Sequence, residues 1–502
     1  MNRLAQLGAL LAAASLGACA SLRTEPPAVS RDAVEALAGG GGFSAAAGSG
    51  TATPAGHESP WWQRFDDPAL AWWVERALVA NLDIAVAAER TQQARALLQQ
   101  ARAARVPQLF AQGEVEWRLR GGGEGTGGFS DRRLQPGAVI GLDLDLDAWG
   151  GLRAAERAAA AGLLRSDELA QAARLSAAGL AARAYVEWQL ARAEQRLLQD
   201  TDVMLREALR IVSVRVEAGI SPVLDRERAR AELASNEAAL AAAAVRAGQA
   251  LAALQVVAGM APRPGPLALR VDLPGTSGVA GPRAPSDAIS PATVPEAEPR
   301  RSVPALEGSQ PLVRPLDLLR LRPDLRASEQ AVRVAAAEVG VAEADLLPRL
   351  RLPGTVVFGA TSGGAVLGLA SAVLAAALDV TLLDGGARAA RRDAAWSRLR
   401  EAGLAWQQAL LRALQQVETA LLAQQGAAER IATGRRGRDA ARAAQVQAET
   451  LYRVGLTNYL DVVEAQRSAL AGERLLLQAQ AEAADASVRA FEAMGLMPPA
   501  GP

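Results

Sequence analysis

Very few residues of this chain could carry covalent chemistry. Its 502 residues include one Cys and one His, and none of its 54 basic residues is a lysine. A Walker phosphate loop and a Schiff base each require a lysine, and a zinc site requires several Cys or His ligands. Zero net charge and only three Tyr also argue against a nucleic-acid partner. We therefore expect a protein that is no enzyme, holds no cofactor or metal, and does not bind nucleic acid.

The single Cys lies where it could be modified. Residues 1–18 contain Arg3, an apolar run and small residues before Cys19, which is the pattern of a secretory signal peptide. Cys19 resembles the lipidated Cys of a bacterial lipobox. Residue 20 is Ala, which resembles the pattern of lipoproteins that are sorted to the outer membrane. We expect palmitate at Cys19 and a flexible, lipid-anchored tether over residues 19–60, in which His57 is a solvated loop residue.

Two matching breaks in the helical pattern carry the remaining candidates. The residues shared at a constant offset of 236 are Gly219 and Gly455, Ser221 and Thr457, Leu224 and Leu460, and Asp225 and Asp461. Each Gly suits the left-handed end of a helix, Ser221 or Thr457 could cap the next helix, and Pro222 suits its first position. Each break therefore predicts a tight turn between antiparallel helices, and their repetition indicates a duplicated chain.

Long helices must position these turns. A helix over residues 150–217 contains no proline and would be about 100 Å long at ~1.5 Å per residue. Seven-residue spacing of apolar residues predicts left-handed supercoiling of four such helices. The repeats are Leu190, Leu197, Met204 and Ile211; Leu233, Leu240, Ala247 and Leu254; Trp396, Gly403, Leu410 and Val417; and Val463, Leu470, Leu477, Ala484 and Phe491. An ordinary helical bundle explains this spacing but not the length.

Further elements repeat as well. Helices are expected from Asn81 to about Arg105 and from Arg322 to about Leu347, at an offset of 241, and Trp61, Trp62, Trp72 and Trp73 should pack against the helical body. Alternating apolar and polar residues predict strands over 111–120 and 138–147, joined by a Gly-rich loop at 121–128. Residues 352–378 are uncharged and could form a membrane helix. Because they occupy the place of the first strand pair, two strands turning at 362–364 are the better interpretation.

Four strands per chain cannot close a membrane barrel, so two or three copies would have to share one. The predicted organisation is a signal peptide (1–18), the tether (19–60), a first repeat (61–261), a linker (262–315), a second repeat (316–495) and a tail (496–502). The predicted fold is mainly α, with duplicated long helical hairpins and a small β part.

The whole pattern resembles the outer membrane factor family of TolC-like and OprM-like trimeric efflux channels, in its NodT-type lipoprotein branch. Its most specific marks are the strand-to-helix junction over 147–153, similar to the family's Asp-Leu-Phe-Gly-x-x-Arg, and the two Gly-x-Ser/Thr-x-x-Leu-Asp turns. The resemblance implies a homotrimer with a twelve-stranded transmembrane β-barrel and a helical periplasmic α-barrel. It also implies a periplasmic adaptor that docks at the turns and an inner-membrane transporter of the RND type.

The resemblance also assigns roles to the turn residues. Asp461 and Glu464 correspond to acidic residues at a closed periplasmic gate, and Tyr452 and Asp225 to residues that tie neighbouring hairpins together. Relatives often have Asp in place of Glu464, and some have Arg in place of Asn458 or Thr457. The expected adaptor contacts are Gly219, Ile220, Ser221, Gly455, Leu456 and Thr457.

The predicted function is a passive exit duct of a tripartite pump for small toxic compounds. Two alternatives remain open, the outer channel of a type I protein secretion system and a structural coiled-coil lipoprotein without a pore. The second alternative predicts no strands over residues 108–147.

Overall fold

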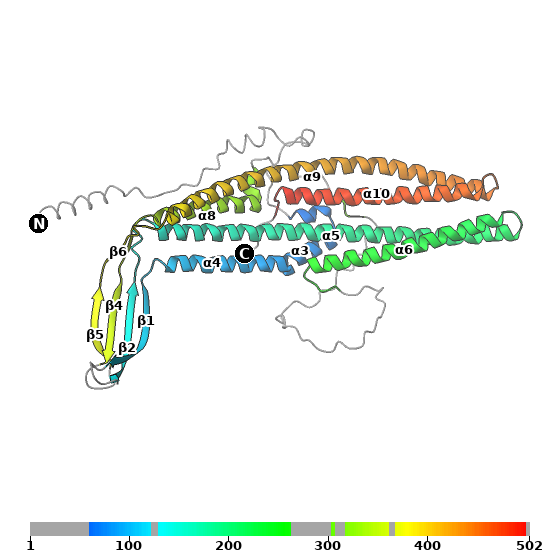
Figure 1. Ribbon diagram of the computed structural model, residues 1–502. Coiled ribbons are helices and arrows are strands. Elements are labelled where there is room, and N and C mark those ends of the chain that lie inside the picture. Colours follow the sequence, from blue (N-terminus) through cyan, green and yellow to red (C-terminus); the bar gives the residue numbers. More distant parts are fainter. Residues whose placement is uncertain (1–59, 122–128, 263–302, 307–316, 361–366, 498–502) are drawn as a thin grey trace. The chain divides into compact units, whose positions relative to one another are not determined.

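The computed structural model describes residues 60–121, 129–262, 303–306, 317–360 and 367–497 (Figure 1). Cys19, His57 and the predicted turn at 362–364 lie outside the described residues, as does the predicted loop at 121–128 beyond Gly121, which belongs to a strand. The short N-terminal helices are η2 (Trp61–Phe65) and α3 (Pro68–Ala80), and α7 (Leu318–Leu321) lies at the start of the second half. The chain divides into two compact units, and each unit takes segments from both halves of the sequence.

The helices repeat with equal lengths in the two halves. Helices α4 (Leu82–Ala103) and α8 (Pro323–Ala344) have 22 residues each. Helices α5 (Gly151–Glu217) and α9 (Ala387–Arg453) have 67 residues each. Helices α6 (Val223–Val257) and α10 (Tyr459–Ala493) have 35 residues each. The long antiparallel hairpins predicted from the turns are therefore present, and we call α5–α6 hairpin 1 and α9–α10 hairpin 2.

The seven-residue spacing is confirmed, but its phase in α5 is wrong. The buried residues of α5 that repeat every seven positions over this stretch are Ala191, Leu198, Leu205 and Val212, one position after the predicted set. Met204, which the prediction placed inward, is 49% exposed. The positions directly after the predicted ones are also apolar, so the sequence alone does not decide which of the two series of residues in α5 is buried. In α9, by contrast, the predicted Leu410 and Val417 are buried.

Helix α6 is long and apolar enough to cross a membrane by length and composition, alone among the described helices. It packs along α5 instead. The Asn236 side-chain amide donates to the Leu198 carbonyl at 3.1 Å, and Arg246 pairs with Glu194 at 2.9 Å.

The strands form one four-stranded antiparallel sheet in the order β1-β2-β4-β5. They are β1 (Gln108–Gly121), β2 (Phe129–Asp143), β4 (Gly354–Ala360) and β5 (Leu367–Leu374), and a small second sheet pairs β3 (Arg349–Arg351) with β6 (Ala377–Asp379). The membrane-helix interpretation of residues 352–378 is therefore wrong. The strand expected to reach Asp147 ends at Asp143, because the chain turns there toward α5 and keeps only one bridge, Asp145 to Arg351.

The sheet has one continuous apolar face. Along the register, Ala111 lies opposite Ile140, Ile140 opposite Val356, and Val356 opposite Ala372. Because alternate residues of a strand point to opposite faces, this row of apolar residues crosses all four strands on one side.

The aromatic N-terminal segment is buried, as expected. Trp61, Trp62 and Trp73 are at most 4% exposed, and Trp61 stacks on Phe491 of α10 with ring centroids 5.4 Å apart. The buried Tyr185 hydroxyl donates to the carboxylate of Asp67, which also caps α3. These contacts fasten η2 and α3 to the two long hairpins.

Candidate functional site at the hairpin turns

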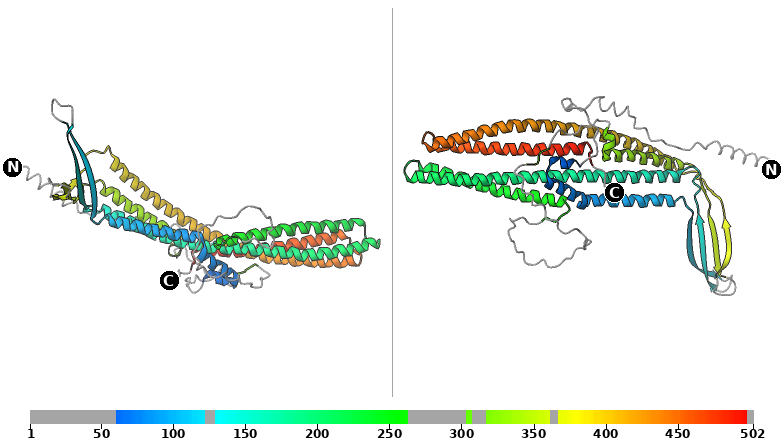
Figure 2. Two further views of the ribbon diagram at one scale, coloured as in Figure 1. Left: turned by 90° about the horizontal axis from the view of Figure 1, so that it is seen from below. Right: turned by 180° about the vertical axis from the view of Figure 1, so that it is seen from behind.

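The two hairpin turns lie in the same compact unit and at the same end of it (Figures 1 and 2). Gly219 has φ +73° and Gly455 has φ +80°, so both occupy the predicted left-handed conformation. The Ile220 N–H donates to the Arg215 carbonyl at 2.8 Å, and the Leu456 N–H to the Leu451 carbonyl at 2.9 Å. These bonds are those of a Schellman motif, which ends both outgoing helices in the same way.

The predicted caps of the return helices are wrong. Pro222 is the N-cap of α6 rather than its first residue, and no side chain caps that helix. Asn458 is the N-cap of α10, and its side chain accepts from the Asp461 N–H at 3.1 Å. In each turn the residue after the Gly donates the Schellman bond, and this residue and the next one both belong to the turn. The N-cap of the following helix is therefore one position beyond Ser221 and Thr457.

A buried cluster joins the two hairpins just above the turns. It contains Tyr452, Tyr459, Val462 and Val463 from hairpin 2 and Val212 and Ala229 from hairpin 1. The rings of Tyr452 and Tyr459 lie 5.5 Å apart. Burial is the largest of the causes that raise the pKa of Tyr459 to about 12, and the nearby Tyr452 and carboxylates add to it. The Tyr459 hydroxyl therefore stays neutral.

Arg215 and Ser221 form polar contacts from hairpin 1 to hairpin 2 beside the turns, and we call these contacts the tip contact. The Arg215 guanidinium carbon lies 4.9 Å from the centroid of the Tyr452 ring. Its Nη1 donates to the Arg453 carbonyl at 3.3 Å, and the Ser221 hydroxyl lies 3.4 Å from the Tyr452 hydroxyl. The sequence prediction included Tyr452 and Ser221 but missed Arg215, which is one of ten arginines in α5.

The structure does not bring the four predicted gate residues together. Tyr452 and Asp225 are 7% and 6% exposed, and Arg228 Nη1 lies 3.6 Å from Asp225 Oδ1. Asp461 and Glu464 are exposed on the outside of α10. The Thr457 hydroxyl donates to Asp461, while Arg467, near Glu464, pairs with Glu232. One chain therefore holds two candidates between its hairpins and presents the other two to its surroundings.

The turns themselves expose aliphatic side chains. Ile220 is 65% exposed and Leu456 is 75% exposed, and Val454 beside the second turn is 66% exposed. Both tips thus present apolar surface in this chain. Among the residues that the structure describes, no group of three or more His, Cys, Asp or Glu side chains is placed to hold a metal ion.

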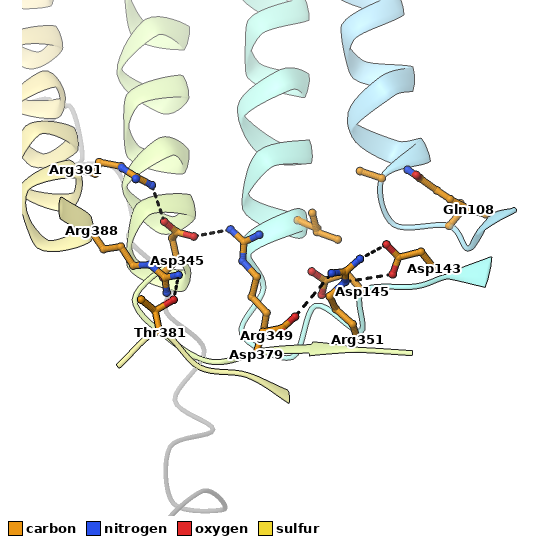
Figure 3. A pocket seen from close by; sticks show the side chains of 13 residues that line it. Gln108, Asp143, Asp145, Asp345, Arg349, Arg351, Asp379, Thr381, Arg388 and Arg391 are labelled. Atoms are coloured by element: carbon orange, nitrogen blue, oxygen red, sulfur yellow. Dashed lines mark hydrogen bonds and ion pairs between the residues drawn. The ribbon is translucent and has the colours of Figure 1, made fainter. Parts of the chain in front are cut away.

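A polar cavity of about 580 Å³ lies where the strands meet the helices in the other unit (Figure 3). Four arginines and four aspartates line it: Arg349, Arg351, Arg388, Arg391, Asp143, Asp145, Asp345 and Asp379. Asp345 accepts from Arg349 at 2.6 Å and from Arg391 at 3.2 Å, while Arg351 bonds to Asp143. The opposite charges are paired with one another, so this cavity is a structural junction between the two halves.

The junction motif has a physical explanation. Asp147 has φ +47°, and its carboxylate accepts from the Leu152 N–H at 2.7 Å and from the Arg153 N–H and Nε at 3.0 Å. Its Asp and Arg therefore hold the chain as it turns from strand to helix, while Gly150 supplies φ +80°.

The second half contains a copy of this junction that sequence comparison at a fixed offset missed. Asp384 accepts from the Gly386 N–H at 2.9 Å and the Arg388 N–H at 3.1 Å, and these bonds lower the pKa of its carboxyl. Gly385 and Gly386 both have positive φ. The signal was present as Asp384-Gly385-Gly386-x-Arg388, with two residues fewer between the Asp and the first Gly.

Comparison with known proteins identifies this architecture. A family model described as outer membrane efflux protein matches residues 73–260 and 315–496. The chain belongs to the outer membrane efflux protein family. The family resemblance inferred from the sequence is therefore confirmed, as is its location in the outer membrane.

The relatives below are efflux components, and the match covers most of their length. The cation efflux system protein CusC of Escherichia coli O6:H1 (strain CFT073) is 25% identical over 421 residues, which are 83% of this chain and 84% of CusC. The solvent efflux pump outer membrane protein SrpC of Pseudomonas putida is 27% identical over 439 residues, or 86% of each chain. A solved structure of the outer-membrane channel OprN aligns with a TM-score of 0.73 and 27% identity, covering 87% of this chain and 92% of that one.

Proposed function

We propose that this protein is the passive outer-membrane duct of a tripartite efflux pump for small toxic compounds. The observation that carries the proposal is the combination of a four-stranded sheet that has a continuous apolar face with two hairpins whose outgoing helices are 67 residues long. An apolar face of a sheet suits contact with lipid. Helices about 100 Å long at ~1.5 Å per residue suit a tube that extends from that boundary.

The number of strands supports a trimer. An open sheet leaves unpaired backbone groups at its edges, and such edges are not tolerated in lipid. Membrane barrels have about eight strands or more, so one chain with four is too small. Three chains in a closed ring would supply twelve strands and remove every edge. The structural alternative without strands over 108–147 is wrong, because β1 and β2 occupy this stretch.

The turns suit two roles in such a trimer. The exposed Ile220 and Leu456 give the tips apolar surface that an adaptor could cover. The tip contact holds hairpin 2 against hairpin 1, so its contacts would have to change for the tube to open at this end. The proposed membrane anchor is a lipid on Cys19. One relative, SilC of Salmonella typhimurium, is named a probable outer membrane lipoprotein, and this name supports a lipid anchor in the proposal.

The test is conductance of the purified protein in planar bilayers, together with complementation of a strain that lacks the chain and is hypersensitive to toxic compounds. We expect ion channels in the bilayer and restored resistance in the strain. Channels with restored protein secretion and no restored resistance would favour the type I secretion alternative. Absence of conductance from a folded, membrane-inserted protein would overturn the proposal.

A further inference from the structure

The charges of the polar cavity in Figure 3 are paired unevenly, and its two sides differ in sign. On one side, Arg349 and Arg391 both bond to the carboxylate of Asp345, and Arg388 Nη1 donates to the backbone carbonyl of Asp345 at 2.9 Å. The nearest partner of Arg388 among the carboxylates is Asp384, at 3.8 Å. Three guanidiniums therefore share two carboxylates on this side, and we call the three arginines the basic pole.

The other side has an excess of carboxylates. Arg351 bonds to Asp143 and lies 3.8 Å from Asp379. Asp145 lies opposite Arg351 in an isolated bridge between their backbones. Among the described residues, no arginine other than Arg351 pairs with these three carboxylates. One guanidinium is therefore shared by three carboxylates, and we call the three aspartates the acidic pole.

Both poles are open to a solute. At the basic pole the side chains of Arg349 and Arg391 are 58% and 68% exposed, although each bonds to Asp345. A guanidinium has five N–H donors in a fixed fork, which suits a carboxylate or a phosphate. At the acidic pole the side chain of Asp379 is 59% exposed. The cavity can thus offer donors to an anionic group and acceptors to a cationic group.

The acidic pole suits an organic cation better than a metal ion. In the part of the chain that the structure describes, no group of three or more His, Cys, Asp or Glu side chains is placed to hold a metal. An ammonium has separate N–H donors and is satisfied by single hydrogen bonds to separate oxygens. The spread carboxylates of this pole meet that requirement.

A second cavity, of about 630 Å³, adjoins the first and shares Asp145, Asp345 and Arg349 with it. Helices α5, α8 and α9 supply apolar side chains to its wall, which includes Ala155, Ala158, Val341 and Ala395. The ring of Trp149 also lines it, and the ring nitrogen is bonded to the Pro348 carbonyl at 2.6 Å. We call this second cavity the helical groove. All of these residues belong to one compact unit.

We propose that the two cavities together bind an amphiphilic zwitterion, a small molecule with an anionic group, a cationic group and an apolar body. Its anionic group lies at the basic pole, its cationic group at the acidic pole and its apolar body in the helical groove. The cavities have volumes of about 580 Å³ and 630 Å³, and small-molecule sites usually have ~300–1,000 Å³.

The site lies on the face of the sheet that would line the duct. Asp143 comes three positions after Ile140 in β2, so it is on the face opposite to the apolar row. In a ring of copies with the apolar row toward lipid, the junction cavity opens to the interior. That such zwitterions are exported through the duct rests on the proposed function, whereas their binding does not.

Three fluorescent probes with the same apolar body test the site. Nε-dansyl-lysine carries both an ammonium and a carboxylate, dansylcadaverine carries only an ammonium, and dansyl-aminohexanoate carries only a carboxylate. The full chain is reconstituted into lipid nanodiscs and titrated with each probe, and the signal of empty nanodiscs is subtracted. Dansyl emission increases when the ring leaves water for an apolar wall, so it reports occupation of the helical groove.

We expect Nε-dansyl-lysine to bind about tenfold more tightly than either probe with one charge, as one further charged hydrogen bond allows. Arg391→Gln should weaken binding of the zwitterion and the carboxylate probe but not of dansylcadaverine. Asp379→Asn should weaken binding of the zwitterion and dansylcadaverine but not of the carboxylate probe. The matched controls Arg333→Gln and Asp439→Asn remove one charge from ion pairs outside both cavities and should change no affinity.

Equal affinities for the three probes would overturn the proposal, as would cavity variants that bind the zwitterion like the controls. Conductance of the same preparation in planar bilayers separates this result from the fate of the duct. Conducting channels without selective binding of the zwitterion would refute the site and leave the proposed function intact. Selective binding without conductance would support the site and count against the duct.

Discussion

Replacement of Arg215 by Ala should loosen the end of the tube at the hairpin turns. Arg215 is the residue through which hairpin 1 contacts both the ring of Tyr452 and the last carbonyl of α9 at Arg453. The substitution removes these contacts from hairpin 1 and leaves the Schellman turn of that hairpin in place, since the turn uses the backbone of Arg215. The expected effect is therefore on the contact between hairpins and not on their folding.

The magnitude follows from the two contacts. A cation–π interaction at a partly buried site contributes about 0.5–2 kcal/mol. A hydrogen bond from a charged group contributes about 1.5–3 kcal/mol, and at 3.3 Å beside water the lower end applies. A loss of about 2 kcal/mol per chain shifts an equilibrium between closed and open tips roughly 30-fold, since ~1.4 kcal/mol is tenfold.

The assay is single-channel recording of the purified trimer at fixed voltage. Arg215→Ala should raise the open probability, and Tyr452→Phe should have a smaller effect because the ring remains. Arg210→Ala is the matched control, because Arg210 lies on the same helix and bonds only to Glu207 within it among the described contacts. Open probabilities that are equal for Arg215→Ala and Arg210→Ala, in stable trimers, would refute the role of the tip contact.

Three further predictions concern the anchor and the turns. Cys19→Ala should abolish labelling of the protein with palmitate but leave its folding intact. Palmitate labelling of the Ala variant would contradict a lipid anchor at Cys19. Gly455→Val should weaken cross-linking to the adaptor more than trimer formation, because φ +80° is strained for a β-branched residue although no atom lies within 4 Å of its Cβ; loss of trimers with adaptor contact retained would argue against this. The double variant Asp461→Ala and Glu464→Ala should remove the block of the channel by millimolar divalent cations, because three copies would place six carboxylates near one opening. The control is Glu482→Ala on the same helix. Equal block in the wild type and the double variant would exclude a ring of these carboxylates.

The sequence predicted the repeated elements well because their signals are local. Gly219 and Gly455 mark helix ends through a backbone conformation that few other residues adopt. The alternation over residues 111–119 depends only on which side chains face one side of a strand. Such features need no knowledge of the partner, so the hairpins and the strand pairs could be derived from spacing.

The details that failed depend on tertiary contacts. Leu190 and Leu198 are equally apolar, and only packing against α6 decides which of the two series of residues in α5 is buried inside the chain. Arg215 has no distinguishing neighbours in sequence, because its partners Tyr452 and Arg453 are more than 230 residues away. The caps at Pro222 and Asn458 were misplaced because the Schellman bonds lengthen each turn by one residue.

The two tips share a backbone conformation but differ in charge. At the offset of 236, Asp225 corresponds to Asp461, while Arg228 corresponds to Glu464. In hairpin 1 the carboxylate is buried and has an arginine 3.6 Å away, so its charge is compensated. In hairpin 2 the equivalent carboxylate is exposed and has a second acid at that position. Like charges on neighbouring copies repel each other. We therefore propose that hairpin 2 is the arm whose position responds to cations and to the loss of Arg215, and that hairpin 1 is the support against which it moves.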